Sequence, residues 1–194
     1  MYMKTKHKNN LKHKIFFLFF FIIILYCLYG YSLDRYYKFY PTINLYPNNF
    51  HEVQIVQQYV QDRNSQMSDF IKYTDKSVIY PFLDIVDESP EQLNKIIVQN
   101  NTIILFFKNL FNRARPKQID PDLDVFNSIS ANTPAFPSGH TYQAYCLAYK
   151  LSDKYPEKKE QLFHIAEKCG QARIYAGLHY PSDHLFSKLL VDFF

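Results

Sequence analysis

Side chains able to perform chemistry concentrate in the second half of this chain. Three cations, two histidines, one carboxylate and a Ser-Gly pair occur there: Lys108, Arg115, Ser138, Gly139, His140, Arg173, His179 and Asp183. A phosphoryl group in transfer carries negative charge on its equatorial oxygens, so fixed Lys and Arg donors stabilise its transition state. The set therefore predicts phosphoryl transfer through a histidine, with the three cations binding the phosphate.

The two histidines and the carboxylate suit different steps of that reaction. An imidazole attacks phosphorus only when its attacking nitrogen is unprotonated, which requires an acceptor for the other ring N–H. Asp183 follows His179 by four residues and can be that acceptor, so His179 is the predicted nucleophile. The leaving alcohol needs a proton as the ester bond breaks. His140 is predicted to supply it.

The residues just before His140 predict a cradle for an oxyanion. Gly139 lets the backbone approach a phosphate closely. The N–H groups of Ser138 and Gly139, with the Ser138 hydroxyl, can add donors at the start of the following helix. These two residues therefore join Lys108, Arg115 and Arg173 as predicted phosphate ligands.

The same residues form three motifs. The first is Lys108, six residues and Arg115-Pro116; the second is Pro137-Ser138-Gly139-His140; the third is Ala172-Arg173, five residues, His179, three residues and Asp183. Together they resemble the signature of the type 2 phosphatidic acid phosphatase (PAP2) and vanadium haloperoxidase superfamily, closest in type to its acid phosphatase-like members. Only Ala172 departs, because a Ser usually precedes the third-motif Arg; we expect weaker phosphate support from that change.

The resemblance implies a fold and an activity. It implies an all-α helical bundle and a metal-independent phosphatase that hydrolyses phosphate monoesters, including lipid phosphates or diphosphates, through a phosphohistidine. His179, His140 and Asp183 would be catalytic, and vanadate would act as a phosphate mimic and inhibitor rather than a required cofactor. Two alternatives stay open, a vanadate-dependent haloperoxidase and a non-catalytic membrane-anchored scaffold.

Other polar residues fit no motif. His51, His164 and His184 are interpreted as surface or incidental residues, although His184 adjoins Asp183. Asp120, Asp122 and Asp124 alternate as at the start of a calcium loop. The required turn Gly and the final Glu are missing, so no metal site is predicted.

The N-terminus differs in composition from the rest. Residues 15–33 carry no charge and follow five lysines, a pattern that favours an uncleaved transmembrane signal anchor. The lysine-rich tail at 1–14 should stay cytoplasmic, which places the remainder on the extracytoplasmic or lumenal side. Without those five lysines the balance is 17 basic against 18 acidic residues. A general nucleic-acid surface is therefore not expected.

After a linker at 34–48, residues 49–194 are predicted to form one phosphatase domain. Apolar residues from position 53 to 71 recur at helical spacing, indicating one long helix or two joined near 63–65. Ser89-Pro90-Glu91-Gln92 is a typical helix start for a segment running to about Asn112. Further helices are expected at 141–152, at 157–177 and after Ser182 as N-cap. No strand pattern is present, so the prediction is an all-α bundle with one N-terminal transmembrane helix.

Overall fold

The computed structural model describes residues 18, 21, 35–38, 40 and 42–193. Within this part, every regular element from position 49 onward is helical, and one isolated bridge pairs Arg35 with Arg113. The elements are α2 (Asn49–Gln61), α3 (Ser65–Asp75), α4 (Tyr80–Leu83), α5 (Pro90–Phe111), α6 (Pro116–Ile119), α7 (Gly139–Lys154), the 3-10 turn η1 (Pro156–Lys158), α8 (Lys159–Tyr175) and α9 (Pro181–Val191). The predicted all-α architecture is confirmed for these residues.

The predicted cytoplasmic tail and transmembrane span fall almost entirely outside the described residues. The tail at 1–14 and the span at 15–33 lie outside the described residues, apart from positions 18 and 21. Of the helices that the structure does describe, none is long and apolar enough to cross a membrane. The division into a linker at 34–48 and a domain at 49–194 stays a prediction.

Helix limits follow capping chemistry that is visible in the sequence. Asn48 caps α2 and Asn64 caps α3 through side-chain oxygens that accept backbone N–H bonds. The apolar stretch from 53 to 71 is thus two helices rather than one. At the start of α5, Ser89 and Gln92 form the predicted capping box, each side chain accepting the other residue's backbone N–H.

Two predicted helix limits are wrong for local reasons. The helix expected at 157–177 begins with the turn η1, and α8 ends at Tyr175, two residues before Gly177 at φ 72°. The helix expected to start from a Ser182 cap instead begins at Pro181. Pro is favoured at a first helical position because the N–H it lacks has no partner there. The Ser182 side chain is then free for a different bond.

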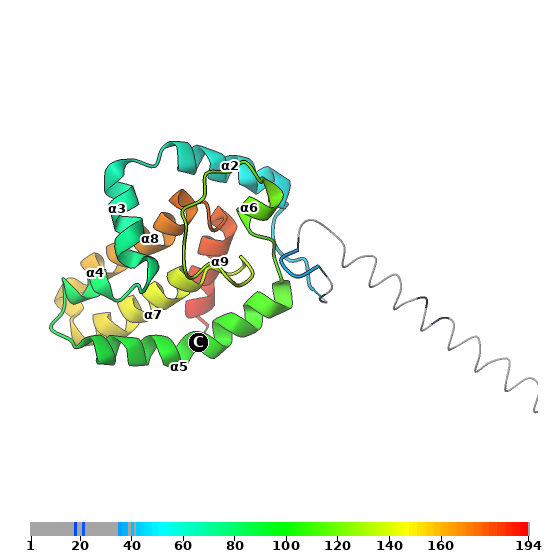
Figure 1. Ribbon diagram of the computed structural model, residues 1–194. Helices are drawn as coiled ribbons and strands as arrows, with labels where there is room; N and C mark the ends of the chain where they lie inside the picture. Colours follow the sequence, from blue (N-terminus) through cyan, green and yellow to red (C-terminus); the bar gives the residue numbers. More distant parts are fainter. Residues whose placement is uncertain (1–17, 19–20, 22–34, 39, 41, 194) are drawn as a thin grey trace, which may run out of the picture.

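Helix α7 lies in the middle of the bundle. It packs against α8, α5 and α9, while α2 and α3 cover α8 from the other side (Figure 1). The main core lies between these helices, and small residues such as Ala144, Ala148 and Ala166 let α7 and α8 approach closely. Burial of this apolar surface is the main force that fixes the helix arrangement.

Four helix ends meet at one place in this bundle. The last turn of α5 and of α8 carry Lys108 and Arg173, and the first turns of α7 and α9 carry His140 and Asp183. A backbone bond joins the two N-termini directly, since the Ser138 N–H donates to the Asp183 carbonyl over 3.1 Å. The fold thereby gathers the three sequence motifs.

Asn112 connects the end of α5 to residues 35–38. It occupies the left-handed region at φ 45°, and its side-chain amide accepts from the Tyr37 N–H and donates to the Tyr37 carbonyl over 2.8 and 2.9 Å. The Tyr36 N–H also donates to the Asn112 carbonyl. Asn is well suited to this position because its short polar side chain tolerates left-handed backbone.

We predict that Asn112→Ala lowers the free energy of unfolding more than Asn112→Gly. Both variants lose the two bonds to Tyr37. Only Ala also carries the left-handed backbone penalty of about 1–2 kcal/mol. Urea unfolding of both variants measures the difference, and equal midpoints would show that the conformation of Asn112 costs nothing.

Candidate active site

His179 is held in one tautomer by a partner at each ring nitrogen. Its Nδ1 lies 3.0 Å from Asp183 Oδ2, and its Nε2 lies 2.9 Å from Arg115 Nη1. A guanidinium can only donate and a carboxylate can only accept. The partners therefore assign the hydrogen to Nδ1 and leave on Nε2 a lone pair that accepts from Arg115, which is the tautomer required of a nucleophile.

Burial keeps this imidazole neutral. His179 is only 3% exposed. Burial, with the positive charges of Arg115, Lys108 and Arg173, lowers the pKa of His179 well below the usual 6.5. The Nε2 lone pair is therefore available at neutral pH.

Asp183 is fixed by a residue to which the sequence assigned no role, Arg113. The Arg113 Nη1 donates to Asp183 Oδ1 over 2.6 Å, and Nη2 donates to Glu52 over 2.6 Å. Asn49 and Ser182 accept two further guanidinium bonds. Burial opposes the charge of Arg113, but Asp183 and Glu52 outweigh it and raise the pKa of the guanidinium. Asp183 is thus locked in place by a fully buried cation.

The three predicted phosphate ligands with positive charge are all buried. Lys108, Arg115 and Arg173 are 5%, 6% and 1% exposed, unlike most Lys and Arg side chains. Burial and the neighbouring Arg115 charge lower the pKa of Lys108 well below its usual value, and burial lowers the pKa of Arg115 to about 10. Cations that disfavour one another's charge gain strongly from an anion placed between them.

The predicted oxyanion cradle forms the N-terminus of α7. Ser138 is the N-cap residue, and its hydroxyl oxygen accepts the Thr141 N–H. Gly139 lies directly against Lys108, since a Cβ at position 139 would stand 3.6 Å from the Lys108 Cε. The Ser138 N–H was predicted to be a phosphate donor, but it is bonded to the Asp183 carbonyl, so that part of the prediction is wrong. The positive end of the helix dipole at Gly139 adjoins the Lys108 side chain.

Arg173 is held by acceptors from two other segments. Its Nη1 donates to Asp75 over 2.9 Å, and its Nη2 donates to Ser128 and Ser130 over 3.0 Å each. Although burial acts to raise the pKa of Asp75, bonds from Ser128 and Arg173 hold it below its usual value. Asp75 therefore stays ionised and positions Arg173.

His140 lies against the same segment in a form that differs from its predicted role. Its Nε2 lies 3.1 Å from the Asp75 carbonyl oxygen, which assigns a hydrogen to Nε2. Burial and the Arg173 charge lower its pKa to about 3, so His140 is neutral in the free protein. A general acid must be protonated, and a phosphate dianion bound nearby would favour that form.

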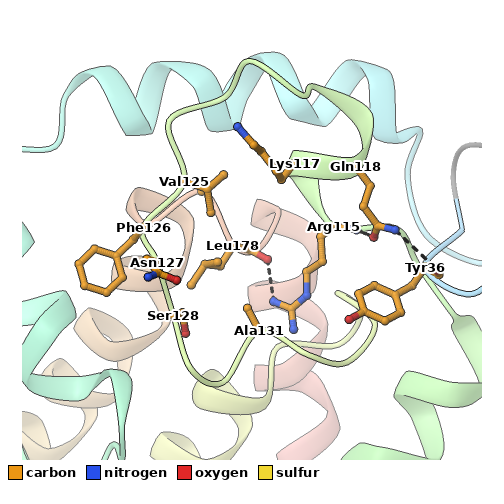
Figure 2. A pocket seen from close by; sticks show the side chains of 11 residues that line it. Tyr36, Arg115, Lys117, Gln118, Val125, Phe126, Asn127, Ser128, Ala131 and Leu178 are labelled. Atoms are coloured by element: carbon orange, nitrogen blue, oxygen red, sulfur yellow. Dashed lines mark hydrogen bonds between the residues drawn. The ribbon is translucent and has the colours of Figure 1, made fainter.

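A cavity of about 670 Å³ opens beside these residues (Figure 2). Arg115 extends into it near Leu178, whose carbonyl accepts from Arg115 Nη1. Its other walls include apolar, aromatic and polar side chains, among them Tyr36, Lys117, Gln118, Val125, Phe126 and Ser128. Its size is in the range of small-molecule sites. Of the predicted site residues, Arg115 lines this cavity, and Arg115 in turn contacts His179 Nε2.

The described residues contain neither a metal-binding cluster nor a disulfide. Within the described part of the chain, no three His, Cys, Asp or Glu side chains lie together as a metal-binding group. Cys146 and Cys169 are both buried and have free thiols. Ala172, which stands where the motif usually has Ser, lies fully buried among apolar side chains.

Four buried polar residues at or next to the site were not predicted from the sequence. Arg113 lies inside the first motif, and alternation in the extended segment Arg113-Ala114-Arg115 could have indicated it. Glu52, Asp75 and His184 come from outside the motifs and have no local signal. The interpretation of His184 as a surface residue is wrong, because it is 8% exposed and hydrogen-bonded at both nitrogens.

The fold and the site together define a class: a helical protein with a neutral, buried histidine among buried cations. Residues 93–191, about half of the 194-residue chain, match the family model of the PAP2 superfamily. The chain therefore belongs to the PAP2 superfamily, whose members are generally phosphatase-like hydrolases. The matched region includes all eight predicted site residues. A search of curated proteins found no match.

We predict that Arg113→Met lowers both stability and turnover. Glu52 and Asp183 would lose a shared buried cation, and removing one partner of a buried ion pair costs about 3–5 kcal/mol. Asp183 would also be less well placed to orient His179. Urea unfolding and kcat of the same variant measure the two effects.

Lys72→Met is the control. Lys72 pairs with Asp69 on the surface, with side chains 64% and 76% exposed, and such surface pairs contribute about 1 kcal/mol or less. A stability loss in Arg113→Met no larger than in Lys72→Met would contradict the positioning role of Arg113.

Proposed function

We propose that this protein is a phosphatase that hydrolyses phosphate monoesters through a phosphohistidine intermediate on His179. The observation that carries the proposal is the pair of contacts to the His179 ring, from Arg115 at Nε2 and to Asp183 at Nδ1. They leave the Nε2 lone pair as the reactive site. The acid phosphatase-like subtype belongs to the same proposal.

The reaction proceeds in two displacements. Arg115 transfers its hydrogen bond from His179 Nε2 to a phosphate oxygen, and Nε2 forms a bond to phosphorus while the bond to the ester oxygen breaks. His140, protonated once the dianion is bound, gives its proton to the departing alkoxide. A water molecule then attacks the phosphorus of the phosphohistidine, and His140 takes a proton from that water. Inorganic phosphate is released, and His179 returns to its neutral form.

Transition-state charge in this proposal is balanced by protein side chains. Lys108, Arg115 and Arg173 supply fixed positive charge, and the Gly139 N–H lies at the start of α7. The Ser138 hydroxyl is the group of Ser138 that would contact the phosphate, because its N–H is bonded to the Asp183 carbonyl. We propose that turnover uses these groups in place of a metal ion. Vanadate, a tetrahedral oxyanion like phosphate, would occupy the same cradle as an inhibitor.

We further propose that residues 15–33 anchor the chain in a membrane, with the lysine-rich tail on the cytoplasmic side and the domain opposite. Tyr36, three residues beyond that segment, lines the cavity next to Arg115. A cavity so close to the predicted anchor favours lipid phosphates among the substrates. No nucleic acid is expected to bind.

The proposal predicts a covalent phosphoenzyme. A brief quench of the full chain with a labelled water-soluble monoester, and separately with labelled phosphatidate, should leave acid-labile, base-stable phosphate on the protein. His179→Ala should abolish both label and activity, because no other imidazole among the described residues lies between a carboxylate and a guanidinium in this way. The ratio of the two labels ranks the soluble and lipid substrates.

Asp183→Asn serves as the second variant of that experiment. It keeps the side-chain shape but disfavours the reactive tautomer, so labelling should slow by about 10²-fold or more while substrate binding persists. Label that survives in His179→Ala would place the nucleophile on another residue.

The role of His140 predicts a dependence on the leaving group. A poor leaving oxygen needs a proton more than a good one, so His140→Ala should slow alkyl phosphates by about 10²-fold or more and nitrophenyl phosphate distinctly less. Lys108→Met, which removes a phosphate ligand, should slow both alike. Equal losses in His140→Ala would make His140 a phosphate ligand instead of the acid.

The same assay should be followed against pH. Activity requires protonated His140 and is lost as pH rises through its pKa, which is about 3 in the free protein. Bound phosphate raises that pKa, so the basic limb of kcat should lie at higher pH than that of kcat/KM. The His140→Ala profile, measured with the same ester, removes contributions from substrate ionisation.

A further inference from the structure

The His184 ring packs into the space that Gly170 leaves between two helices. It belongs to the first turns of α9, and its ring stands over Gly170 of α8. A Cβ at position 170 would lie 2.1 Å from His184 Nδ1, far closer than atoms can approach. The absence of a side chain at position 170 is therefore what admits the ring.

A row of four hydrogen-bonded side chains runs from Glu167 through His184 and Thr141 to Ser138 in the phosphate cradle. Glu167 Oε1 lies 2.9 Å from His184 Nε2, and His184 Nδ1 lies 3.1 Å from Thr141 Oγ1. The Thr141 hydroxyl in turn lies 3.0 Å from the hydroxyl of Ser138. These are hydrogen-bond distances throughout. A change in the protonation of His184 can thus alter the hydrogen bond that Ser138 receives.

The Glu167 end of the row is always an acceptor. Its carboxylate accepts from Lys188 of α9 over 2.7 Å and from the Tyr145 hydroxyl of α7 over 2.6 Å. Although burial acts to raise its pKa, these bonds lower the pKa of Glu167 to about 2. Because the ionised carboxylate cannot donate, His184 Nε2 carries a hydrogen in both protonation states. Lys188, Glu167 and Tyr145 are the charged or titratable groups around the ring.

In neutral His184 the hydrogen bonds of the row point away from the cradle. Nδ1 has a lone pair, so the Thr141 hydroxyl donates its only hydrogen to Nδ1. Ser138 Oγ then loses the hydrogen that Thr141 Oγ1 donates to it in the structure. The longer bond from the Thr141 N–H remains, so the Ser138 hydroxyl is held less firmly toward the place where a phosphate oxygen would bind.

In protonated His184 the bond between Nδ1 and Thr141 reverses, while the Nε2–H bond to Glu167 keeps its direction. Nδ1–H donates to Thr141, the Thr141 hydroxyl donates to Ser138 as it does in the structure, and the Ser138 hydrogen is free to donate to a bound anion. We propose that His184 is a positioning residue that sets the direction of the Ser138 hydroxyl, so that its protonation strengthens oxyanion binding. This role rests on the proposed phosphatase function, because Ser138 acts there as a phosphate ligand.

The effect has a defined pH range. Burial lowers the pKa of His184 below 6.5, with Glu167 partly opposing the shift. The protonated, tighter-binding form is therefore populated as pH falls below that value. Linkage requires the reciprocal effect, so oxyanion binding must draw a proton onto His184.

Calorimetry with sulfate tests this role in the full chain. Sulfate is tetrahedral and stays a dianion, so a change of its affinity with pH comes from the protein. Between about pH 8 and about pH 5.5 the wild type should gain about tenfold more affinity than His184→Gln, the value of one charge-assisted hydrogen bond. Titrations in buffers of different ionisation enthalpy should show extra proton uptake by the wild type.

Two further variants make the result specific. Thr141→Val keeps the shape of Thr141 but breaks the row, so it should lose the same pH-dependent gain although His184 remains. His164→Gln replaces an exposed histidine of α8 and should behave as wild type. Equal proton uptake and equal pH dependence in wild type, His184→Gln and Thr141→Val would overturn the role of His184 alone. A wild type that binds no sulfate would overturn the cradle as well.

Discussion

The carboxylate of Asp183 is the group on which both the site and the packing around it depend. Oδ1 accepts from Arg113, while Oδ2 accepts from His179 Nδ1 and from the Tyr180 N–H. The backbone carbonyl of the same residue accepts from the Ser138 N–H. One residue at the start of α9 thereby joins all three motifs. Its negative charge is the counterpart of several buried cations.

A site built this way is unfavourable until an anion enters it. Removing Lys108, Arg115 and Arg173 from water costs free energy that Asp75 and Asp183 offset only in part. Burial, and then the neighbouring positive charges, depress the pKa values of Lys108 and of both site histidines. In the proposed reaction, a phosphate ester would supply negative charge, and its transition state would spread that charge over oxygens close to these groups.

The polar residues around the site form chains of hydrogen bonds, in which each outer residue fixes the orientation of the next one inward. Glu52 and Asn49 of α2 fix Arg113, which fixes Asp183, which orients His179. Asp75 at the end of α3 similarly holds Arg173. Helices α2 and α3 thus lie outside the matched family region but determine the geometry within it. They hold Asp183 and Arg173 in place through buried, hydrogen-bonded charges.

The sequence by itself determined most of the helices and the three motifs whose residues meet at the site. Local signals sufficed for that, because a capping box such as Ser89 with Gln92, or the interval from His179 to Asp183, involves neighbours in the chain. Partners that lie far apart left no such signal. Arg113 and Glu52 are 61 residues apart, and Arg173 and Asp75 are 98 apart. The protonation of His140 and His179 was equally beyond the sequence, because burial and surrounding charge set a pKa. Only the packing of the helices brings those charges together and excludes water from them.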